Sequence, residues 1–162
     1  HRMCLGAKTC LQEGLQNAGF LRTQIEKLPD YFAPGEVSEI WITFPDPQLR
    51  TSKARKRLTH PQFLRLYQQV LVPGGSIQLK TDSPKLYAFT RRVAKLYGLN
   101  IVEELEDVYA VPHKPELDIK THYEALDIAQ SNKIYYLHFT LPASLPHLDD
   151  ALQEELKTTE LN

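Results

Sequence analysis

The sequence predicts an α/β fold, in which a mostly parallel sheet is layered by helices and ends in an antiparallel hairpin. Apolar, β-branched segments alternate with amphipathic helical segments along most of the chain. The last two strand-like segments follow one another without a predicted helix between them, as in a hairpin at a sheet edge. The 162 residues are 42% hydrophobic and 24% charged, which suits one globular domain with a buried core.

The first elements are predicted from periodicity and from turn residues. Leucine and alanine at helical spacings predict a helix over residues 5–17, closed near Gly19. Residues 20–25, "FLRTQI", predict a short strand that passes into a helical stretch ended by Pro29. The nearly continuous apolar run "VSEIWITF", residues 37–44, is typical of a strand buried on both faces. We therefore expect this strand in the middle of a parallel sheet.

Capping residues mark the next two helices. Thr59 or His60 can cap a helix with proline at its first position, and "VPGG" ends that helix. The strand "SIQLKTD" then leads to Ser83, which can cap another helix that Gly98 closes.

Two further strands are expected near residues 101–109 and 133–141. They are separated by about two dozen irregular residues that look too polar to be core, and a connection of that length is usually functional or mobile. The chain is predicted to form a single domain over residues 1–162, in which residues 142–162 are an acidic tail or helix.

The charge is unevenly distributed although the net charge is only −1. Five cationic residues fall within residues 50–57, whereas residues 103–107 and the C-terminal tail are acidic. A compact basic cluster on a nearly neutral protein indicates a local contact to a polyanion, and the alternative is a solvated helix face.

The sequence also bears on location and on metal binding. No apolar run approaches the roughly 20 residues that cross a bilayer, and no signal-peptide core is present, so we expect a cytosolic protein. Cys4 and Cys10 lack a CxxC spacing and a neighbouring histidine pair, which predicts free thiols and no metal site.

Two aspartates follow predicted parallel strands, where the ligands of open α/β sheets collect. Asp46 stands between Pro45 and Pro47, which restrict the backbone and hold the carboxylate rigidly. Asp82 follows the next strand. The alternative for each aspartate is a turn or helix-capping role.

Four motifs in order carry a resemblance to a known family: "FPDP" with a basic run, "LVPGG", "TD" before a helix, and "THYE". Together they resemble the bacterial tRNA (guanine-N7-)-methyltransferase family, from about Leu5 to Leu141. The resemblance implies a Rossmann-like class I methyltransferase fold with three αβα layers. It also implies S-adenosylmethionine as methyl donor and a guanine of the tRNA variable loop as substrate.

The resemblance also assigns residues. Asp46 matches the active-site acid, which in the family also lies against the methyl-donor site. Thr23 stands where many members have a cofactor-contacting aspartate. The positions that match substrate-binding residues are Arg50, Asp82, Thr121, His122, Tyr123 and Glu124. The chain departs from the family at Gln48, where tryptophan or phenylalanine is common, and after Glu124, where arginine and glycine are usual.

With tRNA as the partner, the basic run is interpreted as phosphate contacts. The residues in question are Lys53, Arg55, Lys56 and Arg57. Tyr123 or a histidine near it could stack on an extruded base, and the alternative for Tyr123 is a buried loop anchor.

A class I methyltransferase normally opens with a strand and a glycine-rich turn for the cofactor, and this sequence contains no GxG. We therefore expect a fragment that lacks the first strands, binds S-adenosylmethionine weakly and is inactive alone. The main alternative is a non-catalytic RNA-binding module or subunit. An exocyclic-amine methyltransferase is a third possibility, although the residue order of "FPDP" does not match its loop. The sequence leaves monomer and homodimer open.

Overall fold

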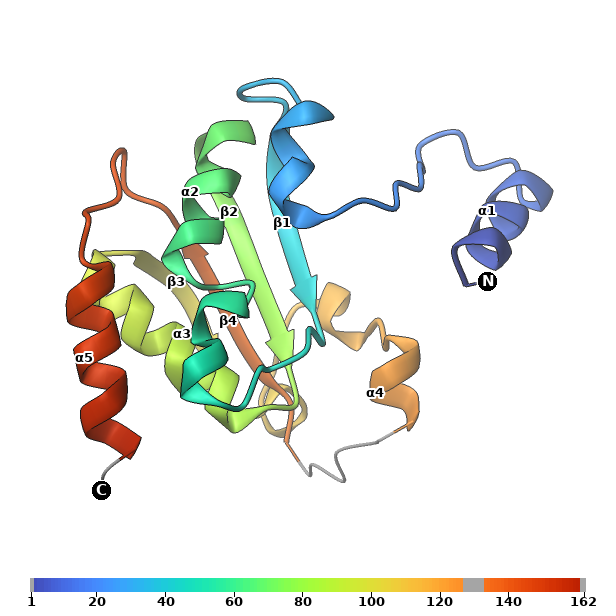
Figure 1. Ribbon diagram of the computed structural model, residues 1–162. Helices are drawn as coiled ribbons and strands as arrows, with labels where there is room; N and C mark the ends of the chain where they lie inside the picture. The colour runs from blue at the N-terminus through green and yellow to red at the C-terminus, as the bar shows by residue number, and fades with distance from the viewer. Residues whose placement is uncertain (1, 127–132, 161–162) are drawn as a thin grey trace.

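Four strands form one sheet in the order β1-β2-β4-β3 (Figure 1). The computed structural model describes residues 2–126 and 133–160. The strands are β1 (Val37–Thr43), β2 (Leu71–Thr81), β3 (Asn100–Leu105) and β4 (Tyr135–Thr140). β1 runs parallel to β2, whereas β4 is antiparallel to both β2 and β3. The predicted α/β fold and its antiparallel strand pair are confirmed, and the arrangement is Rossmann-like.

Helices and 3-10 turns connect the strands. The α-helices are α1 (Arg2–Gln12), α2 (Pro61–Val70), α3 (Pro84–Tyr97), α4 (His122–Leu126) and α5 (Asp149–Glu160). The 3-10 helices are η1 (Ile25–Asp30), η2 (Thr51–Lys56), η3 (Val108–Ala110) and η4 (Pro115–Asp118). His60 caps α2 by accepting a hydrogen bond at Nδ1, Ser83 caps α3 through its hydroxyl oxygen, and Gly98 ends α3 at a φ of 66°. These three caps were predictable from the residue types alone.

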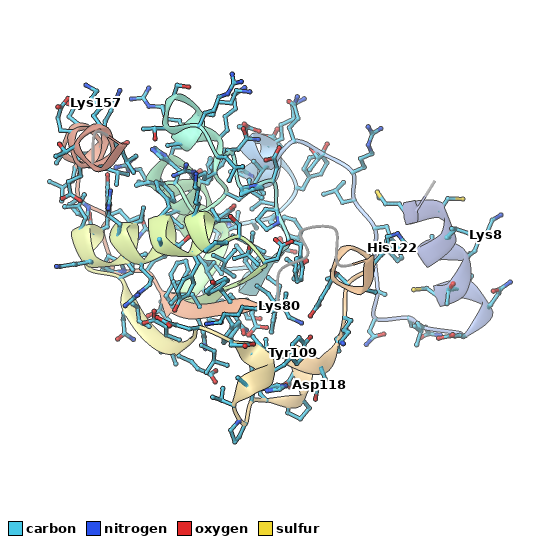
Figure 2. The ribbon with its side chains drawn as sticks, turned by 90° about the horizontal axis from the view of Figure 1, so that it is seen from below. Lys8, Lys80, Tyr109, Asp118, His122 and Lys157 are labelled. Carbon is cyan, nitrogen blue, oxygen red and sulfur yellow. The ribbon has the colours of Figure 1, made fainter. Side chains whose placement is uncertain are left out.

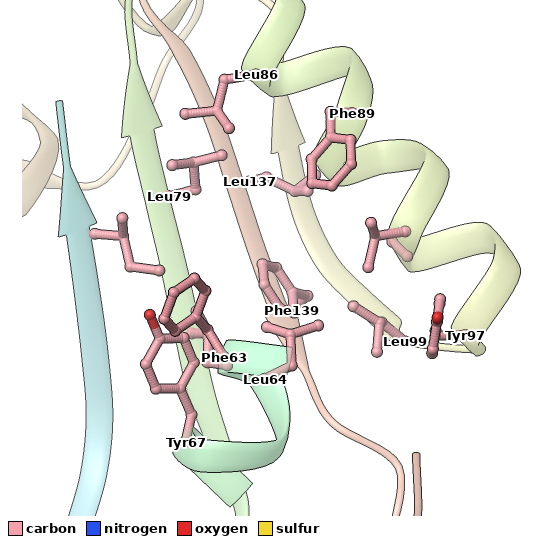
Figure 3. Packing of buried hydrophobic residues seen from close by; sticks show 14 of the residues in the cluster. Phe63, Leu64, Tyr67, Leu79, Leu86, Phe89, Tyr97, Leu99, Leu137 and Phe139 are labelled. Atoms are coloured by element: carbon pink, nitrogen blue, oxygen red, sulfur yellow. The ribbon is translucent and has the colours of Figure 1, made fainter. Parts of the chain in front are cut away.

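The main core lies between one face of the sheet and the helices α2 and α3 (Figure 3), and α5 adds Leu152 to it. In β2, Ile77 and Leu79 point into this core, where they meet Leu137 and Phe139 of β4. All four side chains are fully buried. Because side chains alternate across a strand, the residues between them must face the other side of the sheet.

The second face of the sheet is covered by the connection between β3 and β4. Val108 of η3 and Leu117 of η4 form a second apolar cluster with Ile134 and Tyr136. The prediction that this connection is too polar to be core is therefore wrong. Each short 3-10 turn buries one apolar side chain against the sheet, and so sparse a pattern of buried residues escapes periodicity arguments.

Two other expectations about strands are also wrong. β1 lies at the edge and not in the middle of the described sheet, and Ile42 is its one buried residue. Residues 20–24 form no strand, and Ile25 instead begins η1, which packs against the main core through Ile25 and Leu28. Of the apolar residues in this segment, Ile25 packs against the core, whereas Phe20 and Leu21 are exposed.

Helix α1 stands apart from the sheet in Figure 1. It ends at Gln12, and Gly14 adopts a φ of 68° just after it, so the helix is shorter than the predicted 5–17 at its C-terminal end. Cys4 is exposed, Cys10 is half-buried, and both are free thiols, as expected.

A carboxylate fastens α5 to the two helices beside it. Asp149 accepts hydrogen bonds of 2.6 and 3.0 Å from the Arg65 guanidinium and one of 2.7 Å from the Tyr97 hydroxyl. The hydrogen bonds from Arg65 are the largest cause that lowers the pKa of Asp149 to about 2. One turn further on, Leu152 is buried in the main core. The acidic C-terminal region is therefore a docked helix.

Candidate active site

The candidate site is built around residues 44–48, which follow β1 and which we call the Asp46 loop. Pro45 and Pro47 flank Asp46 and restrict the backbone on both sides of it. The Asp46 side chain is exposed, and its Oδ1 accepts a hydrogen bond of 3.0 Å from the backbone amide of Gln48. The loop thus presents a carboxylate to solvent in a defined orientation at the carboxyl end of β1.

The backbone is strained at both ends of the Asp46 loop. Phe44 and Gln48 have φ values of 49° and 47°, and they are the non-glycine residues with positive φ in the described part of the chain. This conformation costs a residue other than glycine roughly 1–3 kcal/mol and persists only where other contacts hold it. One such contact is the hydrogen bond of 2.8 Å from the Phe44 amide to the Lys80 carbonyl oxygen. The sequence gives no sign of this strain, because neither residue type favours positive φ.

The basic segment, residues 50–57, follows the Asp46 loop and contains η2. Arg50, Lys53, Arg55 and Lys56 are all exposed. Within residues 2–126 and 133–160, no carboxylate forms an ion pair with any of these four side chains. They form a cationic surface beside the Asp46 carboxylate.

Arg57 differs from the other cations of the basic segment, because it is only 5% exposed. Its Nε lies 3.2 Å from the carbonyl oxygens of both Pro47 and Gln48, and its Nη2 lies 3.0 Å from the latter. The guanidinium carbon stands 4.5 Å from the centroid of the Phe89 ring. The sequence groups Arg57 with the phosphate contacts, but its guanidinium faces the Asp46 loop and not solvent.

Asp82 lies directly after β2 and is half-buried. Because β1 and β2 are parallel, Asp46 and Asp82 both lie at the end of the sheet where the carboxyl ends of these strands are, as the sequence predicts. The turn after Asp82 is fixed by the Thr81 hydroxyl oxygen, which accepts a hydrogen bond of 3.1 Å from the Ser83 amide.

A buried ion pair joins β2 to the β3–β4 connection at this end of the sheet. The Lys80 ammonium donates to Glu124 Oε2 at 3.0 Å, and the two side chains are 2% and 4% exposed. Lys80 also donates to the carbonyl oxygen of Leu117 at 2.7 Å. Glu124 accepts a further hydrogen bond from the Tyr109 hydroxyl, and burial together with this bond raises the pKa of Tyr109. Figure 2 looks at the carboxyl ends of β1 and β2, where Lys80 and Tyr109 lie side by side.

The sequence motif "THYE" forms the start of α4. Glu124 and Thr121 exchange hydrogen bonds, since the Thr121 amide donates to the carboxylate at 3.3 Å and the Glu124 amide donates to the hydroxyl oxygen at 3.2 Å. This reciprocal pair is a capping box, which needs a hydroxyl and a carboxylate three residues apart. The Glu124 carboxylate, a predicted substrate ligand, is thus occupied by Lys80, Tyr109 and the cap.

The other predicted site residues lie further from this network. His122 is exposed on α4, and Tyr123 belongs to the same helix, although its side chain lies outside the described residues. Thr23 is half-buried in the segment between α1 and η1. Within the described part of the chain, no hydrogen bond joins Thr23 to Asp46 or Asp82.

Lys80 adjoins the candidate site, but none of the predicted site motifs includes it. Its position between Leu79 and Thr81 in "IQLKT" places it on the sheet face opposite to Leu79, and this alternation was visible in the sequence. Among the described residues, no three histidine, cysteine, aspartate or glutamate side chains gather as metal ligands. None of the helices in the described ranges is long and apolar enough to span a membrane.

Comparison with known proteins identifies relatives of the chain. A sequence model of a family described as "Putative methyltransferase" matches residues 6–137. A tRNA (guanine-N(7)-)-methyltransferase of Porphyromonas gingivalis is 49% identical over 142 residues, which are 86% of this chain and 57% of that protein. Proteins of the same name from Bacteroides fragilis and Christiangramia forsetii are 43% and 41% identical over 145 and 142 residues.

The chain covers only part of these relatives. The last two alignments include 87% and 86% of this chain but 56% and 63% of the relatives. The chain therefore spans between 56% and 63% of the length of the three proteins. The resemblance predicted from the four ordered motifs is confirmed, and because the family model matches most of its length, the chain belongs to this family of putative methyltransferases.

Proposed function

We propose that the protein transfers a methyl group from S-adenosylmethionine to N7 of a guanine in the tRNA variable loop. The observation that carries this proposal is the Asp46 loop, whose exposed carboxylate is fixed beside a cationic surface. Relatives that share up to 49% identity with the chain are named tRNA (guanine-N(7)-)-methyltransferases. The proposal therefore joins a local geometry to a family membership.

Asp46 is suited to hold the base. N7 of guanine has an available lone pair and no proton to lose, so its methylation depends on positioning more than on a strong general base. A carboxylate can accept hydrogen bonds from N1–H and from the exocyclic amine of the guanine, which would turn N7 toward the donor. The same negative charge would stabilise the positive charge that develops on the ring.

Of the other side chains near the carboxyl ends of β1 and β2, some are proposed to contact the guanine nucleotide and others the phosphates of the RNA. Asp82, Thr121 and His122 lie near the same end of the sheet and are proposed to contact the nucleotide. Exposed cations beside the Asp46 loop are proposed to contact phosphates, which position the RNA without reading its sequence. These cations are Arg50, Lys53, Arg55 and Lys56.

The methyl donor would supply a methyl group on a positively charged sulfur, which makes that carbon electrophilic. Asp46 and Thr23 are the residues of this chain proposed to face it. The fit rests on the donor set, because an exposed carboxylate and a hydroxyl can accept hydrogen bonds from the amine and ribose of such a ligand. Neither residue needs to exchange a proton with the substrate in this scheme.

A non-catalytic RNA-binding module is the alternative, since it would need only the cationic surface. The enzyme is favoured because a strained loop that orients one carboxylate has no use in phosphate binding. Backbone strain of this kind clusters at active sites and ligand clamps.

The test uses the protein translated from the complete reading frame, incubated with unmodified tRNA and labelled S-adenosylmethionine. We expect label in 7-methylguanine, mapped to the variable loop by nuclease digestion and chromatography. Asp46→Asn keeps the size of the side chain but replaces one acceptor oxygen by a donor, so we expect kcat to fall at least about 100-fold.

A matched control is Asp118→Asn, because Asp118 is an exposed aspartate of η4 that pairs with His113. This variant should retain methylation. Label on another base, or full activity of Asp46→Asn, would contradict the proposed function.

A further inference from the structure

We propose that Arg57 is a positioning residue that holds the Asp46 loop in its strained conformation, and that it does not contact RNA phosphate. The proposal rests on the proposed function for the importance of Asp46. Its structural part stands on the contacts of Arg57 alone. Arg57 belongs by sequence to the basic segment, yet it is the one cation of that segment that is buried.

The first argument is what the guanidinium binds. Nε and Nη2 of Arg57 point at two successive carbonyl oxygens, those of Pro47 and Gln48, over distances of 3.0–3.2 Å. A planar fork of donors can reach adjacent acceptors in this way, whereas a lysine ammonium offers one centre. Both carbonyls lie on the C-terminal side of Asp46, so Arg57 fixes the direction in which the chain leaves the carboxylate.

The second argument is the strained conformation that these bonds maintain. Gln48 has a φ of 47°, and the carbonyl oxygens on either side of that torsion are the ones that Arg57 holds. At the other end of the loop, the Phe44 amide is bound to the Lys80 carbonyl oxygen. The loop that carries Asp46 is therefore held on both sides, by the Lys80 carbonyl of β2 before it and by the Arg57 guanidinium after it. Without Arg57 the Gln48 torsion would relax toward negative φ and would turn the Asp46 carboxylate.

The third argument is that Arg57 is itself immobile. Its backbone amide donates to the Ala54 carbonyl oxygen at 3.0 Å, and its carbonyl oxygen accepts from the His60 amide at 2.8 Å. The guanidinium is stacked on the Phe89 ring of α3, and Phe89 is 3% exposed. A cation on an aromatic face with carbonyl acceptors at its edge satisfies the requirements for burying a charge. These contacts tie the Asp46 loop to η2, α2 and α3.

The test compares three variants of the protein from the complete reading frame. Arg57→Lys keeps the charge but loses the fork, so we expect kcat for tRNA methylation to fall roughly 100-fold, as for small misplacements of a reacting group. KM for tRNA and the salt dependence of RNA binding should stay near their wild-type values. Arg55→Gln, which removes an exposed neighbouring charge, should instead raise KM and lower the salt slope by about one. Lys95→Gln, at the far end of α3, should leave kcat, KM and the salt slope unchanged.

Two measurements separate positioning from folding and from the proposed function. Hydrogen exchange of the peptide that covers residues 44–50 should be faster in Arg57→Lys than in wild type, while peptides of β2 and β4 stay protected. In the wild-type protein the Nε–H of Arg57 should exchange slowly, which is a readout that needs no variant. If wild type fails to methylate guanine N7 but both exchange results hold, the proposed function falls and the role of Arg57 stands. A rapidly exchanging Nε–H, or a kcat of Arg57→Lys that stays at the wild-type value, would overturn the role of Arg57.

Discussion

Lys80 is buried beneath the β3–β4 connection although it carries a charge, because carbonyl oxygens and the Glu124 carboxylate replace the water that it loses. The Lys80 ammonium also lies 6.0 Å from the ring of Phe44, the first residue of the Asp46 loop. One side chain of β2 thus neighbours both the loop that carries Asp46 and the helix that carries Glu124. The positions of the Asp46 loop and of α4 thus depend on the buried contacts of Lys80.

Removing one partner of this ion pair should destabilise the protein strongly. Lys80→Met leaves the Glu124 carboxylate buried without its cation, and we expect a loss of about 3–5 kcal/mol in the free energy of unfolding. The double variant Lys80→Met/Glu124→Gln should lose less than the sum of the two single variants, because it leaves no unpaired charge. Urea denaturation followed by circular dichroism measures all four proteins.

The control for that cycle is the exposed pair formed by Lys157 and Glu154 in α5, whose atoms lie 2.6 Å apart. Lys157→Met should cost no more than about 1 kcal/mol, because water screens the pair. Equal losses for Lys80→Met and Lys157→Met would rule out the assigned strength of the buried pair.

His60 gives the stability of the protein a defined pH dependence. Its pKa is lowered to about 4, chiefly by burial and also by the charges of Arg55, Arg65 and Arg57, while the charge of Asp149 opposes this shift. Between about pH 6.5 and pH 4 the unfolded state binds the proton and the folded state does not. Stability should therefore fall as the pH falls through this window, by roughly 3 kcal/mol in total.

His60→Asn retains an acceptor at the N-cap of α2 but cannot titrate. Urea midpoints measured from pH 7 to pH 4 should fall less steeply for this variant than for wild type. Identical slopes would exclude His60 as the source. The pair of Asp149 and Arg65 is lost only at lower pH, toward the pKa of about 2, so it does not confound this comparison.

At the scale of elements, the helices were predicted best and the connections worst. The helices α2 and α3 carry proline at the first position, a polar cap before it and, in α3, glycine after the last turn, so local residue types define them. The β3–β4 connection carries local start signals as well, such as the capping box of Thr121 and Glu124, but its apolar residues are buried against a sheet that is distant in sequence. The split of the basic segment into an exposed part and a buried Arg57 depends on α3 in the same way. The sequence shows which residues of that segment are charged, but it does not show which of them face solvent and which are buried.

The exposed cations of η2 should act together on RNA binding. Replacing Lys53, Arg55 and Lys56 by glutamine should raise the dissociation constant for tRNA and lower the slope of log K against log salt by about two to three. The thermal midpoint should change little, because none of the three side chains is buried. Titrations at several salt concentrations, with Lys95→Gln as control, measure this effect, and an unchanged slope would reject the phosphate role.

For the whole molecule, the sequence predicts the α/β class, the family and the placement of Asp46 and Asp82 after the carboxyl ends of two parallel strands. It does so because parallel strands and capped helices are local patterns whose assembly follows general rules. It does not predict that β1 is an edge strand, since the composition of "VSEIWITF" is the same whether or not a further strand pairs with it. It also does not predict the strain at Phe44 and Gln48, which arises from contacts to Lys80 and Arg57.

The strand order has a consequence for how the chain folds during synthesis. β4 lies between β2 and β3, so these two earlier strands have no hydrogen bonds to each other. Until the ribosome has released residues 135–140, the four strands described here can form only a β1–β2 pair and a separate β3. The sheet is then completed only when β4 pairs with both β2 and β3, and such pairing between distant parts of the sequence slows folding. The strand made last completes the sheet, and nascent chains that stall before residue 135 should be the species that needs chaperones.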